Sequence, residues 1–122
     1  RNKKILKQVI PESSYTIEDP VRYDGMFRAR LFNFGRWEDV YIDDYLPVIY
    51  GKKLWGGRSS SDDSELWVAL LEKAFAKKHG SYDAIYGGAS EDAYMQMTGG
   101  VGERIDLKGM KPKKQAKVLY DR

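Results

Sequence analysis

The sequence is informative first for the residue types that it lacks. It contains no cysteine and a single histidine among its 122 residues. Without cysteine, the chain has no disulfide framework, no thiolate metal ligand and no cysteine nucleophile of its own. No apolar run approaches the roughly 18 residues of a membrane helix, and no signal segment opens the chain. We therefore expect a cytoplasmic protein without stable membrane insertion.

A large charge excess of either sign is also missing. The chain has 21 basic and 18 acidic residues, which leave a net charge of +3. The basic residues gather near the two ends of the chain, where solvated helix faces are the simplest interpretation. This balance predicts no nucleic-acid partner. Hydrophobic residues make up 42% of the chain, enough to build the core of one domain.

The stretch from Asp62 to Gly88 is the part that the rest of the chain is arranged to support. Its apolar residues recur at the spacing of one helix face, at Trp67, Leu70, Leu71, Ala74 and Phe75. Asp62 and Glu65 form a pair typical of a capping box at a helix start. Gly80, after two lysines and a histidine, predicts the helix end. The sequence thus predicts a long central helix that buries one face.

Strand patterns precede this helix. Apolar and basic residues alternate over residues 26–31, and a second run follows the turn at residues 33–36. Two such runs with a short glycine-containing connection predict an antiparallel β-hairpin. Residues 48–55 predict a further short strand pair around Gly51. Asp43 and Asp44 close the second strand, and we interpret them as turn residues, because successive strand side chains point to opposite faces.

The remaining elements are shorter. Residues 1–10 carry a helical stripe that ends at Pro11, and a polar connector follows as far as Tyr23. Ser90 is expected to cap a short helix, which the glycines at 99 and 100 end. Residues 101–107 are expected to form a strand, and Pro112 a helix start.

Few groups in the chain are suited to catalysis. His79 lies beside the helix-ending Gly80, where a cationic side chain stabilises a helix without any catalytic purpose. No phosphate-binding, zinc or dinucleotide motif is present. Composition and spacing alone predict a mixed domain of helices and strands.

Three ordered blocks carry a resemblance to a known family. They are FNFGRWEDVYIDDYLPV at residues 32–48, ELWVALLEKAFAKKHGSYDAIYGG at 65–88 and MTGGVGERIDL at 97–107. These blocks closely resemble the protease core of calpains, the calcium-dependent cysteine endopeptidases that cleave intracellular proteins. The resemblance implies an α+β, papain-like core of two lobes with the active site between them. On that pattern, residues 1–122 form the part of the first lobe after the nucleophile helix and run into the connection to the second lobe.

The resemblance also implies which functional residues are present. In the family, the catalytic cysteine lies upstream of the position of Arg1, and the histidine and asparagine lie downstream of Arg122, so the chain alone is expected to be inactive. Its implied partners are the nucleophile helix, the second lobe and protein substrates. An alternative is a calpain-like parent that has lost its nucleophile and serves as a binding module.

Three positions match functional residues of the family. Glu65 matches a glutamate that helps to bind calcium in the first lobe, together with ligands on the loop before the nucleophile. Hard oxygen ligands suit calcium, although the capping role explains an acidic residue there equally simply. Gly87 and Gly88 resemble the glycine pair that hydrogen-bonds an extended substrate peptide. The alternative explanation for both glycines is a turn that needs positive φ.

Overall fold

The computed structural model describes residues 3–12, 23–51, 53–62 and 64–121. It contains helices and two short antiparallel sheets that follow one another along the chain, which confirms the predicted α+β class. In chain order the elements are α1 (Lys3–Val9), β1 (Met26–Asn33), β2 (Arg36–Asp43), β3 (Val48–Ile49), β4 (Lys53–Leu54), α2 (Trp67–His79), the 3-10 helix η1 (Asp83–Ile85), α3 (Ser90–Thr98) and α4 (Pro112–Tyr120).

The predicted β-hairpin is confirmed. Strands β1 and β2 pair antiparallel, with Phe27 opposite Ile42 and Asn33 opposite Arg36. The two residues between the strands, Phe34 and Gly35, have φ angles of 44° and 83°. Positive φ at both turn positions gives the twist that matches paired strands. The turn therefore fixes the register that places the apolar residues of both strands on one face.

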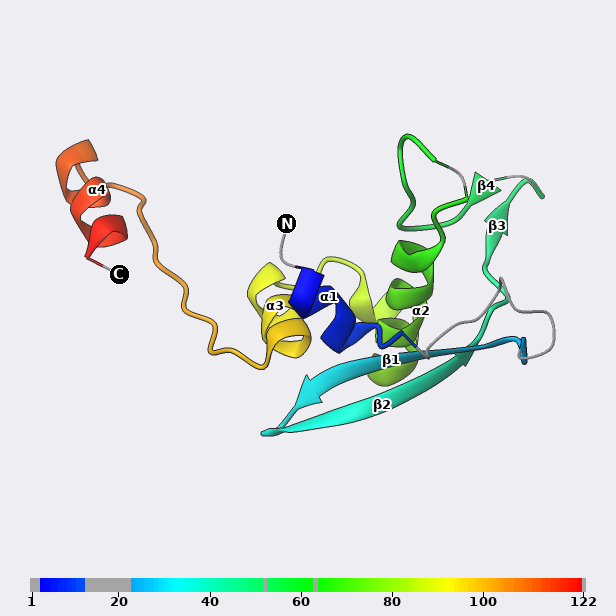
Figure 1. Cartoon of the computed structure of the whole chain (residues 1–122). Helices are drawn as coiled ribbons and strands as arrows, with labels where there is room; N and C mark the ends of the chain where they lie inside the picture. The colour runs from blue at the N-terminus through cyan, green and yellow to red at the C-terminus, as the bar shows by residue number, and fades with distance from the viewer. Residues whose placement is uncertain (1–2, 13–22, 52, 63, 122) are drawn as a thin grey trace.

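That face of the hairpin forms the core together with α2. Helices α1, α2 and α3 all lie on one side of the hairpin (Figure 1). The predicted apolar stripe of α2 is confirmed, because it packs against the hairpin and joins one cluster of buried side chains. The cluster consists of Val9, Phe27, Ala29, Leu31, Ile42, Leu70, Leu71 and Ala74. Burial of such apolar surface is the main term that holds helix and hairpin together.

The start of α2 differs from the sequence prediction. Leu66 is the residue before the helix, no side chain caps it, and the Leu70 N–H donates to the Leu66 carbonyl at 3.0 Å. Asp62 is not a helix cap, because its Oδ1 accepts the N–H and the hydroxyl of Ser64 at 2.9 and 2.6 Å. The predicted capping box is therefore wrong. The predicted helix end is confirmed at Gly80, whose φ is 102°.

Two predictions near the end of the chain are corrected and two are confirmed. Ser90 is the first residue of α3 instead of its cap, and the cap position is Ala89. Gly99 ends α3 with a left-handed φ of 70°, as predicted. Residues 101–107 do not form the predicted strand, because no strand of the described chain pairs with them. Helix α4 has Pro112 in its first turn, as predicted.

The remaining elements follow the sequence closely. Helix α1 ends before Pro11, and β3 and β4 pair around a turn in which Tyr50 and Gly51 have positive φ. Asp43 accepts the N–H of Tyr45, a local bond that confirms its turn role. Most of the predicted polar connector, residues 13–22, lies outside the described residues. Among the described helices, none is both long and apolar enough to cross a membrane.

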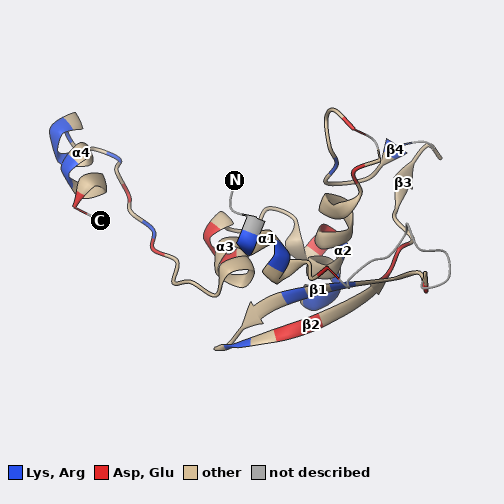
Figure 2. Ribbon diagram, viewed as in Figure 1, with Lys and Arg blue, Asp and Glu red and all other residues tan. Residues whose placement is uncertain are grey.

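Charged side chains reinforce the hairpin and its attachment to α2. Figure 2 shows a basic band on β1 beside an acidic band on β2. On the face away from the core, Arg30 and Arg28 lie 3.2 and 4.0 Å from the Asp39 carboxylate. On the core side, Lys78 of α2 lies 3.5 Å from Glu38, and its side chain is only 10% exposed. The lysine compensates a carboxylate that stands opposite buried Leu31 in the register.

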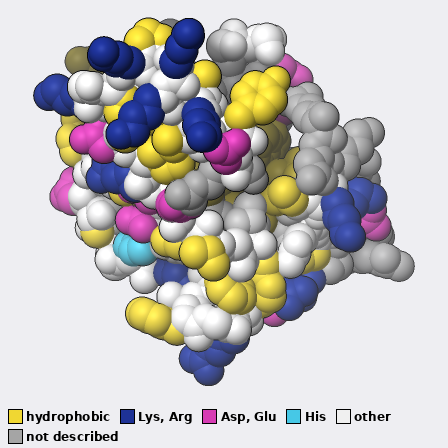
Figure 3. Space-filling view, turned by 90° about the vertical axis from the view of Figure 1, so that its left-hand side faces the viewer, with side chains coloured by type: hydrophobic (Ala, Val, Ile, Leu, Met, Phe, Trp, Pro, Cys, Tyr) yellow, Lys and Arg dark blue, Asp and Glu magenta, His cyan; other side chains and the backbone are white. Residues whose placement is uncertain are grey.

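Helix α4 stands apart from the rest of the described chain. It follows an extended segment that leads away from α3 (Figure 1). Figure 3, viewed from this side, shows lysine and arginine side chains gathered around hydrophobic ones. Leu119 and Tyr120 of α4 are 59% and 92% exposed, and Val101 at the start of the segment is 97% exposed. An amphipathic helix with its apolar residues exposed has no buried face in the described chain.

Candidate calcium and substrate sites

Glu65 lies just before α2, on the surface of the molecule. Its Oε1 accepts the indole N–H of Trp67 at 2.9 Å. Asp62 lies on the same turn, since its carbonyl accepts the N–H of Glu65 at 3.2 Å. The hydroxyl and N–H of Ser64 hold the pKa of Asp62 below its usual range. Both carboxylates are thus held by hydrogen bonds in the turn before α2.

A cavity of about 470 Å³ adjoins these two carboxylates. Its walls come from the β4 strand, the following loop and the turn before α2, and include Lys53, Arg58, Ser59, Asp62 and Glu65. Carboxylate and hydroxyl oxygens are donors that calcium prefers, so the donor chemistry fits the predicted metal. Calcium takes six to eight oxygens, however, and among the described residues no three acidic or histidine side chains lie close enough together to hold a metal ion. These residues therefore fit as part of a calcium site that needs further ligands.

The two glycines predicted to contact substrate differ in their backbone conformation. Gly87 has a φ of 76°, which L-residues rarely adopt. A turn requirement therefore explains Gly87. Gly88 does not have a positive φ, and an added Cβ there would meet no atom within 4 Å. The turn requirement does not explain Gly88, and the open space beside it leaves room for another main chain.

Gly88 also lies at the edge of an apolar groove. The groove has a volume of about 550 Å³ and runs between α2, η1 and α3. Trp67, Leu71 and Phe75 of α2 line one wall, and Ala93 and Met97 of α3 line the other. Leu71 is buried, whereas Trp67 and Phe75 are only partly buried. The described chain thus leaves part of its apolar helix stripe open next to Gly88.

The single histidine contacts Phe75 of α2 and Gln96 of α3. His79 stacks on Phe75 with ring centroids 6.2 Å apart, and its Nε2 lies 3.2 and 3.3 Å from the amide atoms of Gln96. It occupies the last turn of α2 at the protein surface, where the histidine is visible in Figure 3. These contacts agree with the predicted role at the helix end and link α2 to α3.

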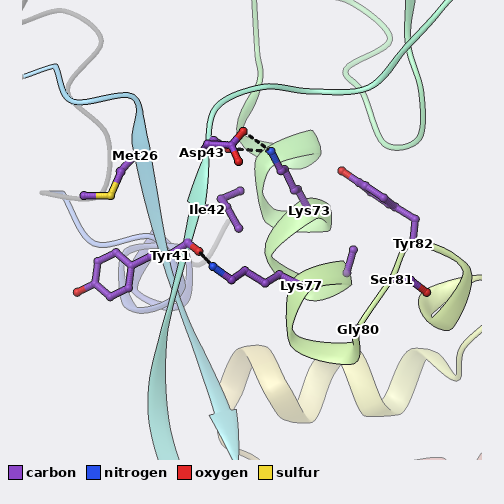
Figure 4. Close-up of a pocket in the computed structure, with 10 residues that line it drawn as sticks. Met26, Tyr41, Ile42, Asp43, Lys73, Lys77, Gly80, Ser81 and Tyr82 are labelled. Atoms are coloured by element: carbon purple, nitrogen blue, oxygen red, sulfur yellow. Dashed lines mark hydrogen bonds and ion pairs between the residues drawn. The ribbon is translucent and has the colours of Figure 1, made fainter.

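A second cavity, of about 590 Å³, lies between β2 and α2 (Figure 4). Its two lysines and its carboxylate already have partners within the fold. Lys73 donates to the Asp43 carboxylate at 2.6 Å, and Lys77 donates to the Tyr41 carbonyl at 2.6 Å. The Lys73 bond, followed by the N–H of Tyr45, holds the pKa of Asp43 below its usual range. The cavity is therefore a structural junction between helix and strand.

One residue with a central position was not singled out from the sequence. Glu72 of α2 accepts the main-chain N–H of Gly57 at 2.7 Å and also lines the apolar groove. The available signal was the glycine pair at residues 56 and 57, which permits close approach of the loop backbone to another element. Glu72 lies fifteen positions from Gly57 in the sequence, and no sequence pattern around Glu72 predicts their contact.

Known proteins similar to most of the chain agree with the resemblance found in the sequence. The family model described as "Calpain family cysteine protease" matches residues 1–122. Calpain-12 of Homo sapiens is 42% identical over 105 residues, which are 86% of this chain and 14% of that protein. Calpain clp-1 of Caenorhabditis elegans is 45% identical over 100 residues, 82% of this chain and 12% of that protein.

A third relative is the Calpain-1 catalytic subunit of Gallus gallus, which is 40% identical over 107 residues. The match covers 88% of this chain and 14% of the relative, so the chain spans only a small part of these proteins. The family match over residues 1–122, together with identities of 40–45% to these three relatives, establishes the relationship. The chain belongs to the calpain family of cysteine proteases.

Proposed function

We propose that residues 1–122 form part of the first lobe of a calcium-dependent cysteine endopeptidase that hydrolyses peptide bonds of intracellular proteins. Catalysis in this proposal uses a Cys–His–Asn arrangement supplied by the rest of the protease core. The chain itself has no cysteine, and its one histidine is engaged by Phe75 and Gln96. The isolated segment would therefore be inactive, and a cytoplasmic location of the parent stays a prediction.

The observation that supports this proposal best is the position of the apolar groove beside Gly88. The groove is lined by hydrophobic side chains of α2 and α3, and Gly88 lies among its lining residues. An amphipathic helix seated in such a groove buries its apolar side chains at helical spacing. We assign this groove to the helix that carries the nucleophile. A nucleophile at the end of that helix would then lie beside the glycine pair.

Gly87 and Gly88 would hold the substrate in this arrangement. Both glycines are exposed, and no side chain obstructs the space beside either Cβ position. A peptide that runs past them in extended form is bound by main-chain hydrogen bonds, which are independent of its sequence. This contact would position the scissile bond without strong side-chain preference.

Glu65 would contribute one carboxylate to a calcium site shared with another loop. Calcium, when bound, supplies a positive charge that draws oxygen ligands of separate loops together. The carboxylate of Glu65 accepts the Trp67 indole N–H and lies at the surface, where a second loop could approach it. Asp62 lies on the same wall of the cavity. The hydrogen bonds of this turn would hold the two carboxylates in place in the absence of the metal.

A substitution in the groove tests the proposed docking. Ala93 lines the groove from α3, so Ala93→Glu in the intact protein would place a charge where the nucleophile helix packs. We expect peptidase activity to fall by about tenfold or more, because a displaced nucleophile loses its alignment with substrate. Tyr94→Glu is the matched control, since Tyr94 lies on the same helix and is 64% exposed. Equal activity of the two variants would contradict the assignment of the groove.

A further inference from the structure

The loop between β4 and α2 approaches the helix closely at its glycine pair. Glu72 Oε2 accepts the Gly57 N–H at 2.7 Å. A Cβ on Gly56 would clash with the same oxygen, and a Cβ on Gly57 would lie 2.9 Å from Val68 Cγ1. Gly56 also has a φ of 87°. The positive φ of Gly56 and the Val68 contact beside Gly57 both favour glycine where the loop backbone approaches α2.

The same loop also contacts the segment that leads to Gly87 and Gly88. The Trp55 ring packs edge-on against Tyr82, with centroids 5.0 Å apart and an interplanar angle of 86°. Tyr82 is the residue before η1, and the glycine pair follows η1 after one residue. Glu72 itself lines the groove that reaches Gly88. The loop therefore contacts the segment before the glycine pair through Trp55 and Tyr82, and Glu72 lines the groove that reaches Gly88.

In the other direction the loop leads to the candidate calcium ligands. Arg58 donates to the Leu54 carbonyl at 3.2 Å, and Ser59 Oγ accepts the Asp62 N–H at 3.3 Å. Asp62 and Glu65 follow directly and share one cavity with Arg58 and Ser59. If these carboxylates moved toward a cation, the short loop before them would move as well. The other end of that loop is held by the hydrogen bond from Gly57 to Glu72.

We propose that Glu72 is a positioning residue that couples the loop carrying Asp62 and Glu65 to the segment carrying Gly87 and Gly88. The inference rests on the proposed function, because it needs an intact protein that binds calcium and cleaves peptides. A carboxylate suits this role, since a hydrogen bond from an N–H to an ionised acceptor is stronger than a neutral one. Coupling of this kind is reciprocal, so calcium affinity and substrate affinity change together when the link is lost.

The test compares Glu72→Ala and Glu72→Gln with the wild-type intact protein. Calcium affinity is measured directly by equilibrium titration. KM and kcat are measured with a peptide substrate, and the order of the loop is measured by hydrogen exchange of residues 54–62. We expect Glu72→Ala to weaken calcium affinity and to raise KM, each by about fivefold or more. The Gly57 amide should exchange faster. Glu72→Gln should change calcium affinity, KM and the exchange rate of the Gly57 amide in the same direction but by less, because its amide oxygen still accepts the Gly57 N–H.

Glu91→Gln is the matched control, since Glu91 is a partly exposed carboxylate on α3 that pairs with Arg104 at 3.7 Å. It should leave calcium affinity and KM unchanged. Wild-type calcium affinity and KM in both Glu72 variants, with only a lower melting temperature, would overturn the proposal in favour of a purely structural role. If Glu72→Ala does not fold, Glu72→Gln decides the question by the same two constants. Failure of the proposed function is seen separately, as a wild-type protein that binds no calcium or cleaves no peptide.

Discussion

The Lys77 ammonium donates a hydrogen bond of 2.6 Å to the main-chain carbonyl of Tyr41, on the strand β2 that pairs only with β1 among the described strands. One helical turn earlier, Lys73 donates to the Asp43 carbonyl at 3.1 Å (Figure 4). Unpaired carbonyls along a strand edge are a template for pairing with another chain. Two lysines of α2 therefore anchor the helix and cover the edge of β2 at the same time.

Replacing Lys77 tests this double role. Lys77→Met in the intact protein should keep the aliphatic packing but leave the Tyr41 carbonyl without its ammonium donor. We expect the free energy of unfolding to fall by about 1 kcal/mol and aggregation on heating to increase. Urea unfolding and light scattering measure the two effects. Lys4→Met, at an exposed position of α1, is the control, and equal behaviour of both variants would show that the Tyr41 bond adds no stability.

Glu38 should make stability depend on pH in the acid range. Hydrogen bonds from Asn33 and then Arg36 hold the pKa of Glu38 below its usual value of 4.5. Because the folded pKa is lowered, this contribution is fully present above about pH 4.5 and is lost as the pH falls through the folded pKa. Glu38→Gln should therefore be less stable than wild type at pH 7, and the difference should shrink below pH 4. A difference that stays constant from pH 7 to pH 3 would exclude this role.

Glu65→Gln separates calcium binding from a structural role. The substitution removes one anionic ligand while keeping the size of the side chain and its bond to the Trp67 indole. We expect the calcium concentration for half-maximal activity to rise by about tenfold, because affinity follows the number of charged ligands. The measurement is a calcium titration of the intact protein. An unchanged midpoint with a lowered melting temperature would assign Glu65 to the support of the turn before α2.

Gly88→Val tests the proposed contact with the substrate main chain. A branched Cβ would enter the space that is open beside Gly88, so kcat/KM should fall by about tenfold or more for every peptide tested. Gly88→Ala should show a smaller loss. Because Gly88 has no positive φ, neither change strains the backbone, and the melting temperature should hold. Unchanged kinetics, or a loss of activity that parallels unfolding, would disprove the contact.

Local chemistry explains which parts of the fold could be predicted from the sequence. The alternation of residues 26–31 and the glycine of the two-residue turn determine the hairpin within one short stretch. Gly80 ends α2 because its own φ of 102° suits glycine. The prediction of the helix start was wrong because the Asp62 side chain bonds to Ser64 instead of the helix N-terminus. The sequence does not indicate which of these nearby groups the carboxylate binds.

Features that depend on contacts between residues far apart in the chain could not be predicted from the sequence. Residues 101–107 carry a strand pattern, but a strand also needs a neighbour, and no strand of the described chain pairs with them. The bond between Glu72 and Gly57 joins two elements that only the folded chain brings together. At the candidate sites, Gly88 and Glu65 were found through resemblance to a family, because a single glycine or glutamate has no specific pattern of its own. Their roles in calcium and substrate binding stay predictions.

Peptide hydrolysis with and without calcium tests the central claim most directly. The claim is that residues 1–122 supply calcium and substrate contacts to a protease whose catalytic residues lie elsewhere. A fluorogenic peptide is offered to the intact protein and to purified residues 1–122, each with calcium and with chelator. The intact protein should cleave it only with calcium, and the segment should be inert in both conditions, since it contains no cysteine. Cleavage by the segment alone, or no cleavage by the intact protein with calcium, would contradict the account.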